Sequence, residues 1–332
     1  MIRSPQAGMT TLLFLLLAAW SVAARAETPP AEDSQAETHK YIRIDRDEAD
    51  EPLSLQTVIV RFVPADDSGG VSVDLVGAVH VGESSYYEAL NKAFEDYDVV
   101  LYELVAPDGT RVEKGTKPSN HPVAMLQNGL KDMLELEHQL QCVDYTKDNM
   151  VHADMSPDAF AKSMEDRGES FFGMFFRMMG HAMAQQSAQK NPTSDFDLLS
   201  AFFDNDRSTA LKRVMAEQFE SLEGVMQALD GPDGSTIITE RNKVALEKLR
   251  EQLDAGKKKI AIFYGAGHLR DMEQRLSDDF KLKRDREQWL DAWNLGKPQK
   301  AKKPAREQKK AASIRPPVAP WHVAPLAAGL TR

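Results

Sequence analysis

The 332-residue chain is acidic overall, with a formal net charge of −10, but its charge is unevenly distributed. Residues 297–332 hold nine Lys or Arg and one acid, Glu307, whereas residues 27–296 hold 30 basic and 50 acidic residues. A body this acidic argues against a nucleic-acid-binding surface. The single cysteine, Cys142, excludes an internal disulfide, so stability must come from an ordinary hydrophobic core.

The first 26 residues have the three parts of a secretory signal peptide. Arg3 supplies a positive start, residues 12–22 are almost wholly apolar, and Ala24-Arg25-Ala26 fits the small-x-small cleavage rule. The apolar stretch has about eleven residues, short of the roughly 20 that span a bilayer, and an uncleaved anchor is the alternative. We therefore predict a mature chain that begins at Glu27, is periplasmic or secreted, and contains no integral membrane span.

The two ends of the mature chain have the composition of disordered segments. Residues 27–40 form a polar leader, and residues 297–332 form a basic tail rich in Pro, Ala and Lys. The folded domain is therefore predicted to comprise residues 41–296, enough to bury one large core or two small ones.

The first predicted elements are three strands, at residues 41–44, 55–63 and 71–79. A helix capped at Ser84 or Ser85 comes next, and residues 98–105 have the composition of another buried strand. Strand, helix and strand within about 35 residues form a βαβ unit. The strands at 71–79 and 98–105 are therefore expected to be parallel and joined by a right-handed crossover, an arrangement in which they can be neighbours.

From about residue 121 to 231 the chain becomes rich in Met and Gln, and we predict a helical insertion without strands. Ser156-Pro157 has the pattern of a helix start, with Pro at the first helical position. Residues 171–189 are unusually rich in Phe and Met, and include Met178 and Met179. This segment is expected to form a helix that is either a substrate-binding wall over the site or an ordinary buried helix.

The α/β pattern then resumes with a helix at 235–255, a buried strand at 259–264, a helix through Leu276, an edge strand at 280–283 and a short helix at 287–294. The predicted fold is α/β, with a mixed central sheet made of two similar strand–Gly-x-x-His–helix halves and a helical insertion.

Two turns of nearly the same sequence come directly after buried strands. One is Val76-Gly77-Ala78-Val79-His80, and the other is Tyr264-Gly265-Ala266-Gly267-His268. Ligands of parallel α/β sheets bind beyond the carboxyl ends of the strands, where such turns lie. The duplication therefore favours a functional role for His80 and His268.

Glu103 is the one charged residue within residues 99–105 (VVLYELV) of a predicted buried strand. A buried carboxylate needs a partner, which a metal ion or an Arg provides equally well. If the strands ending near His80 and Glu103 are neighbours, about 4.8 Å apart, their side chains share one site. Histidine with carboxylate suits a divalent metal such as Zn, Mn or Co, or a general acid–base pair.

A last polar group, Glu240-Arg241-Asn242, lies on the helix before the His268 strand. Together with Gly77/His80, Glu103 and Gly265/His268, this group resembles the TraB/GumN/PrgY family, which is related to the Tiki metalloproteases. The resemblance covers about residues 55–285 and extends to residues 151–154 (VHAD), which resemble a mid-region patch of that family.

The resemblance implies a mixed sheet of two similar halves with a helical insertion over the site. Tiki members are metal-dependent proteases, and TraB-type bacterial members are tied to the inactivation of peptide pheromones. It thus implies an exported hydrolase that acts on a peptide or protein, with a divalent ion (Mn, Co or Zn).

In that interpretation His80, Glu103 and His268 hold or flank the metal, and Arg241 with Asn242 stabilises an oxyanion or anchors a substrate carboxylate. The chain has neither an HExxH motif nor a Gly-x-Ser-x-Gly elbow. The alternative is a non-catalytic protein of the same fold that sequesters a peptide or other ligand. Neither the oligomeric state nor the pathway can be inferred from the sequence.

Overall fold

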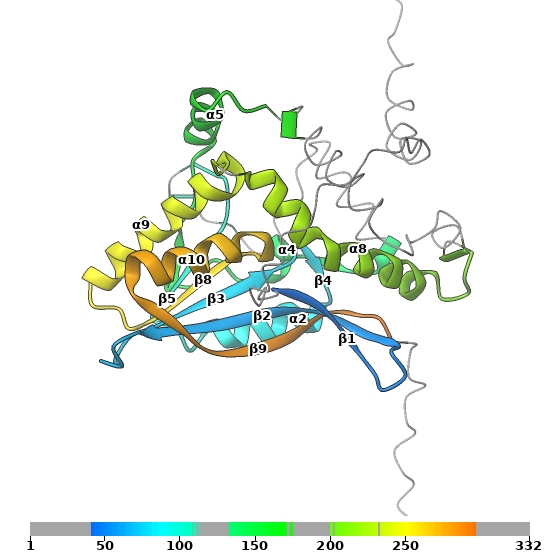
Figure 1. The fold of residues 1–332 in the computed structure, drawn as a ribbon. Coiled ribbons are helices and arrows are strands. Elements are labelled where there is room, and N and C mark those ends of the chain that lie inside the picture. Colours follow the sequence, from blue (N-terminus) through cyan, green and yellow to red (C-terminus); the bar gives the residue numbers. More distant parts are fainter. Residues whose placement is uncertain are drawn as a thin grey trace, which may run out of the picture. The chain divides into compact units, whose positions relative to one another are not determined.

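The structure of the chain is a computed structural model. It describes residues 41–107, 109–110, 112, 133–170, 173–174, 200–201, 203–231 and 233–296. These residues all belong to one compact unit, Met1–Lys297. The unit is an α/β structure built on a mixed central sheet of parallel and antiparallel strands, as predicted (Figure 1).

The central sheet has seven strands in the order β1-β2-β3-β8-β5-β7, with β9 paired to β2. Their bounds are Ile42–Arg46 (β1), Pro52–Pro64 (β2), Ser72–Ala78 (β3), Val99–Tyr102 (β5), Met150–His152 (β7), Lys259–Gly265 (β8) and Leu282–Asn294 (β9). Strands β3, β8, β5 and β7 are parallel, whereas β1, β2 and β9 form antiparallel pairs. A separate two-stranded sheet pairs β4 (Val81–Gly82) with β6 (Glu137–His138).

Strands β3 and β5 are parallel, as predicted, but they are not neighbours. Strand β8 lies between them, with Val76 of β3 opposite Phe263 and Leu101 of β5 opposite Ile262. Residues 260–264 of β8 are all buried. A strand with a run of apolar residues such as Ile260–Phe263 is favoured at the sheet centre, where both faces are covered. Strand β8 therefore separates two strands that are close in sequence.

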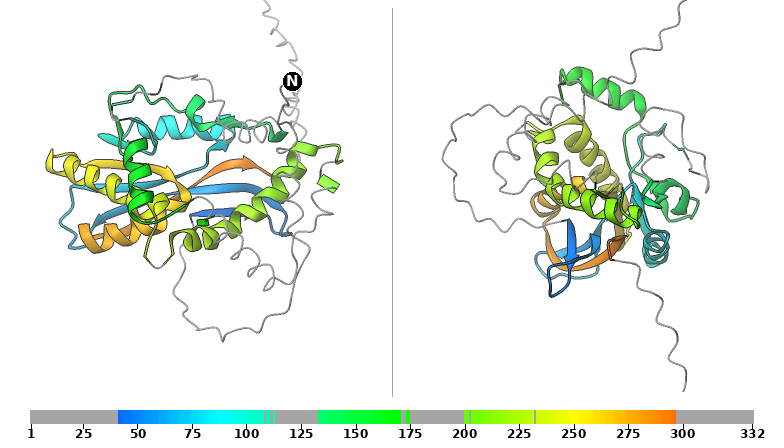
Figure 2. Two further views of the ribbon diagram at one scale, coloured as in Figure 1. Left: turned by 90° about the horizontal axis from the view of Figure 1, so that it is seen from above. Right: turned by 90° about the vertical axis from the view of Figure 1, so that its right-hand side faces the viewer.

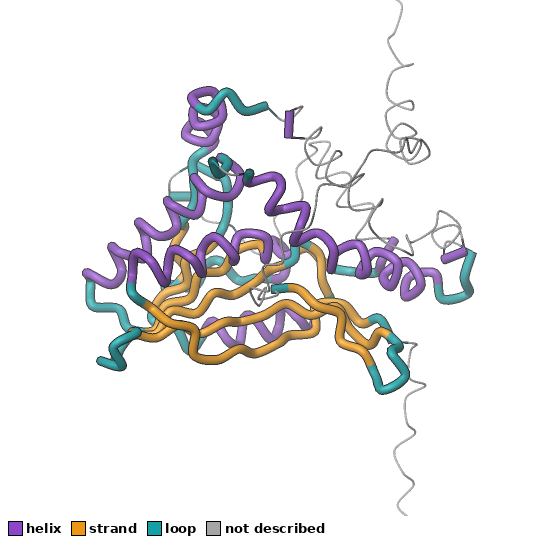
Figure 3. The backbone as a smooth tube through the Cα atoms, viewed as in Figure 1, coloured by secondary structure: helices purple, strands orange, loops and turns teal. Residues whose placement is uncertain are grey.

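Helices cover both faces of the sheet (Figures 1 and 3). Helix α2 (Ser84–Phe94) packs on one face and buries Tyr87, Leu90 and Phe94. Helices α9 (Arg241–Asp254) and α10 (Leu269–Phe280) pack on the other face. The two sides of the sheet thus form two separate hydrophobic clusters, and each strand alternates its side chains between them.

The region from 121 to 231 is not purely helical. It contains helices α4 (Gln139–Cys142), α5 (Pro157–Asp166) and α8 (Arg207–Asp230), together with strands β6 and β7. Strand β7 joins the central sheet beside β5, and three residues are too few for a sequence pattern to reveal. The predicted start of α5 is confirmed, because the Ser156 side chain accepts the Ala159 N–H. Met178 and Met179 lie outside the described residues.

The last element is also a correction, because residues 282–294 form one strand and the expected helix at 287–294 is part of it. Trp289, Leu290 and Trp293 have helix-like spacing, but β9 pairs with β2 from Leu282 to Asn294. The Trp293 indole N–H donates to the Val81 carbonyl at 2.8 Å. Pairing along a whole neighbouring strand outweighs local preference.

None of the helices in the described ranges is long and apolar enough to cross a membrane.

Candidate active site at the carboxyl edge of the sheet

Polar side chains gather where the parallel strands end. Glu103 directly follows β5, Asp154 lies two residues after β7, and His268 lies three residues after β8. Parallel strands present their carboxyl ends at one edge, so these three side chains approach one another there. Arg241 and Asn242 reach them from the start of α9. These five residues form the buried cluster.

Arg241 is the centre of the buried cluster. Its Nε donates to Asp154 Oδ1 at 2.9 Å and its Nη2 donates to Asp154 Oδ2 at 2.6 Å, a bidentate pair. The same Nη2 donates to Glu103 Oε1 at 2.6 Å. The side chain of Asp154 is fully buried, and those of Arg241 and Glu103 are 10% and 11% exposed. Such pairing is what allows charged groups to remain buried.

Glu103 is fixed by both of its oxygens. While Oε1 accepts from Arg241, Oε2 accepts the Gly265 backbone N–H at 2.6 Å. A Cβ at Gly265 would lie 3.3 Å from Oε2, which is closer than most such contacts. Glycine therefore lets the backbone of the second turn approach the carboxylate closely.

The Asn242 side chain determines which nitrogen of His268 carries the proton. Asn242 Nδ2 donates to the His268 carbonyl at 3.0 Å and to the Asp271 carboxylate at 2.8 Å, and both of these groups only accept. Asn242 Oδ1 is therefore the acceptor for His268 Nδ1, at 2.7 Å. The lone pair of the neutral ring is thus on Nε2, which lies 3.6 Å from Glu103 Oε1.

Burial and charge set the protonation states in the cluster. Burial opposes the ionised form of Glu103, but the charges of protonated His268, Arg241 and His80 outweigh it and lower the pKa of Glu103 to about 2. Burial lowers the pKa of His268 to about 4, despite the charge of Glu103. At pH 7 the cluster therefore contains two carboxylates, one guanidinium and a neutral imidazole, and its net charge is −1.

His80 lies at the rim of this site. Its side chain is exposed, and its charge lowers the pKa of both Glu103 and His268. Its backbone carbonyl accepts the Gln139 N–H at 3.0 Å. The structure therefore brings Glu103, His268 and Arg241 into direct contact and leaves His80 open to solvent beside them.

Gln139, next to the His80 turn, has an unused acceptor. Its residue is 6% exposed, and its Nε2 donates to the Tyr145 hydroxyl at 2.9 Å. Within the described ranges, Gln139 Oε1 is the buried side-chain atom without a hydrogen-bond partner. An orphaned buried acceptor costs about 1–3 kcal/mol.

Asp154 is the site residue that the sequence does not predict. It belongs to residues 151–154, for which the resemblance implies no particular role. The usable signal is an acid shortly before the Pro157 helix start. Its partner Arg241 cannot be recognised from sequence, because 87 positions separate the two residues.

A divalent ion fits only part of this donor set. Glu103 Oε1 and His268 Nε2 are separated by the roughly 3–4 Å expected of two ligands on one ion. The Asn242 contact to Nδ1 is the outer-shell bond that metal-binding histidines typically make. However, Arg241 Nη1 lies 3.5 Å from Nε2, and no group of three His, Cys, Asp or Glu in the described part of the chain is arranged to hold an ion. A complete site would require His80 as a third ligand from the rim.

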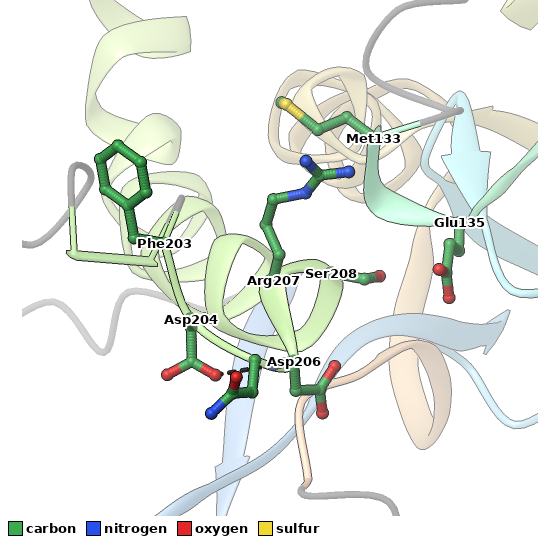
Figure 4. Close-up of a pocket in the computed structure, with 8 residues that line it drawn as sticks. Met133, Glu135, Phe203, Asp204, Asp206, Arg207 and Ser208 are labelled. Carbon is green, nitrogen blue, oxygen red and sulfur yellow. Dashed lines mark hydrogen bonds between the residues drawn. The ribbon is translucent and has the colours of Figure 1, made fainter.

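Two hollows of the molecule lie elsewhere. One, of about 520 Å³, adjoins the start of α8 (Figure 4) and is lined by Met133, Glu135 and residues 203–208. The other, of about 570 Å³, lies against β2, β3 and β9 and contains Arg61 and Asp74. Neither contains a member of the buried cluster, so the cluster is identified by its chemistry.

No family model matches the chain, no curated protein matches it, and no solved structure matches it.

Proposed function

We propose that this chain is an exported metal-dependent hydrolase that acts on peptides or proteins. The observation that supports this most is a histidine of fixed tautomer whose unprotonated Nε2 lies 3.6 Å from an ionised carboxylate, inside a cluster of net charge −1. Buried charges with perturbed pKa values at the carboxyl edge of a parallel sheet are typical of functional sites. The resemblance to the TraB/GumN/PrgY family suggests the peptide substrate.

The residual negative charge is the reason to propose a cation. His268 Nε2 and Glu103 Oε1 would hold a divalent Mn, Co or Zn ion, with His80 as the third ligand. Such an ion polarises a carbonyl group and makes water acidic enough to be a nucleophile at neutral pH.

The protein groups supply orientation and charge. Asn242 holds the His268 ring in the tautomer that leaves Nε2 unprotonated, and Gly265 holds Glu103 through its N–H. Arg241 uses Nε and Nη2 on the two carboxylates, and its Nη1 lies 3.5 Å from His268 Nε2. Nη1 is the nitrogen that would turn to a substrate oxygen or a developing oxyanion once an ion occupied Nε2.

A second candidate function is a protein that binds a peptide without cleaving it. The observation that favours it is that Arg241 pairs with both Glu103 and Asp154, so an arginine already supplies these carboxylates with a cation. A substrate ammonium group would then neutralise the remaining charge. A cleavage assay separates the two functions, because only a hydrolase releases cleaved peptide products.

The test uses the mature protein, residues 27–332. Its metal content is measured after dialysis, and a peptide library is incubated with Mn²⁺, Co²⁺ or Zn²⁺, with and without chelator, then read by mass spectrometry. Glu103→Gln should abolish metal-dependent cleavage. Glu273→Gln is the matched control, because Glu273 also pairs with an arginine, Arg284, but lies on α10 outside the cluster.

Chelator-sensitive cleavage that Glu103→Gln removes and Glu273→Gln retains supports the hydrolase. Cleavage that survives chelator or Glu103→Gln contradicts it. Peptide capture without products under every metal favours the binding function. An N-terminus at Glu27, measured by intact mass in exported protein, tests the proposed export.

A further inference from the structure

One arginine outside the buried cluster joins two segments of the chain that both lead to the cluster. Arg167, just after α5, donates from Nε to Glu169 Oε1 at 2.9 Å and from Nη1 to Glu240 Oε1 at 3.2 Å. Its Nη2 donates to the carbonyls of Asp233 and Gly234. The fork of one guanidinium thus serves two carboxylates and two backbone carbonyls.

Two further contacts join the same segments. Glu169 Oε2 accepts the backbone N–H of Thr236 at 3.0 Å, and the hydroxyls of Ser163 and Thr236 lie 2.9 Å apart. The side chains of Glu169 and Glu240 are 8% and 21% exposed. We call these three residues, Ser163, Arg167 and Glu169, together with their contacts, the Arg167 clamp.

The clamp holds an unusual piece of backbone. Residues Thr236–Glu240 (η1) form a single π-helical turn, with the Glu240 N–H bonded to the Ser235 carbonyl at 3.0 Å. Asp230 fixes the other side of the turn by accepting from the hydroxyls of Ser235 and Thr239. Single π turns are rare and occur mostly at functional sites.

The π turn ends where the site begins, since Arg241 and Asn242 are the next two residues. Both must face the cluster, Arg241 toward Glu103 and Asn242 toward His268. If the turn relaxed to an ordinary α turn, the register would change by one residue. A change of one residue rotates a side chain by about 100° around the helix axis.

We infer that Arg167 is a positioning residue, which holds the π turn so that Arg241 and Asn242 both point into the site. The segment from 154 to 169 is tied at one end to α9, by Asp154 on Arg241, and at the other end to the π turn, by Arg167 on Glu240. The elements concerned lie side by side, with α5 above the start of α9 (Figures 1 and 2). The consequence for catalysis rests on the proposed function, but the structural consequence does not.

The structural test follows the guanidinium of Arg241 in the full mature protein by NMR with ¹⁵N-arginine labelling. The Nε–H signal, assigned by its loss in Arg241→Lys, should exchange slowly with water because it is buried on Asp154. In Arg167→Ala its exchange should become at least about tenfold faster in conditions where the protein remains folded. Arg167→Lys should be intermediate, because an ammonium group replaces only part of the fork.

The matched control is Lys162→Ala, which removes an exposed i,i+4 pair with Asp166 from the same helix. It should leave the Arg241 signal unchanged. If Arg167→Ala does not fold, Glu169→Gln replaces it, since it keeps the side-chain shape and weakens the same contacts. Unchanged Arg241 exchange in the folded clamp variant overturns the inference.

Turnover is the second measurement. Arg167→Ala should lower kcat at least about tenfold and change KM less than about threefold. If the wild-type protein shows no hydrolysis but Arg167→Ala speeds Arg241 exchange, the positioning role stands and the proposed function is rejected. If the wild-type protein hydrolyses peptides but Arg167→Ala leaves Arg241 exchange unchanged, the proposed function stands and the positioning role is rejected.

Discussion

The two Gly-Ala-x-His turns have almost the same sequence and occupy different environments. His268 is 4% exposed, bonded through Nδ1 to Asn242 and packed against the Tyr264 ring at 5.2 Å between centroids. His80 is exposed at the rim. Strands β3 and β8 are neighbours and end together, with Ala78 opposite Gly265, so their position in the sheet does not explain the difference.

The elements that come after the two turns differ, and they account for the contrast. After His268 the chain enters α10 directly, and the buried Leu269 draws the histidine under the helix. After His80 the chain remains extended through Val81–Gly82, which pairs with Glu137–His138 before α2 begins. A helix that starts at once pulls its first residues inward, whereas an extended pair leaves them at the surface. One motif thus provides a fixed histidine and a solvent-facing one.

The largest effect on stability is expected at Arg241, which lies in the buried cluster together with His268 of the second Gly-Ala-x-His turn. Arg241→Ala leaves the carboxylates of Glu103 and Asp154 buried without a cation, which should cost about 3–5 kcal/mol in free energy of unfolding. Lys248→Ala on the same helix, where the lysine pairs with Glu251 at the surface, should cost less than about 0.5 kcal/mol. Urea denaturation measures both, and a loss below about 1 kcal/mol for Arg241→Ala would show that the cluster opens to water.

The pH dependence of stability should also separate the two histidines. Because the pKa of His268 is lowered to about 4 in the folded state, the unfolded chain binds a proton below pH 6.5 that the folded protein does not. Stability should therefore fall by about 3 kcal/mol as pH decreases from 6.5 to 4. The lowered pKa of Glu103 adds a further loss from pH 4.5 toward 2.

Denaturation at a series of pH values, with chelator present, checks this. His268→Gln should remove the decrease between pH 6.5 and 4, and His80→Gln should retain most of it, because burial is the largest cause of the lowered pKa of His268. Equal pH profiles for both variants would mean that the two turns are electrostatically alike.

The glycines of the two turns should respond differently to a methyl group. At Gly77 a Cβ would lie 3.2 Å from the Val58 carbonyl, and backbone cannot move easily. Gly77→Ala should therefore cost about 1–3 kcal/mol of stability. At Gly265 the Cβ meets the Glu103 carboxylate, so Gly265→Ala should lower cleavage more than stability. Thermal unfolding beside the peptide assay tests this, and the opposite ranking would contradict the contacts.

The smallest effect on stability is expected at His80. His80→Ala should change the free energy of unfolding by less than about 0.5 kcal/mol, because the side chain is exposed. The same variant should nevertheless lose metal uptake and cleavage if His80 completes the site. Full activity of His80→Ala would leave the second turn as the functional one.

Much of the scaffold was predictable because it depends on local chemistry. Apolar runs predicted β2, β3 and β8, the Ser156-Pro157 signal predicted α5, and the Gly-x-x-His turns placed two histidines at one edge. Glu103 was recognisable because a charge in an apolar run requires a partner. The sequence left open whether that partner is a metal or an arginine.

The rest depended on contacts between distant segments. The position of β8 between β3 and β5, the pairing that turned residues 287–294 into part of β9, and the short strand β7 all arise from sheet pairing across the chain. Asp154 acquires its role only when Arg241 reaches it from α9. By itself the sequence determined which residues are chemically able to act, because local burial and composition are written in it. The tertiary structure decided which of these residues meet. Strand pairing and the burial of charges depend on contacts between segments that are far apart in the sequence, as between β2 and β9.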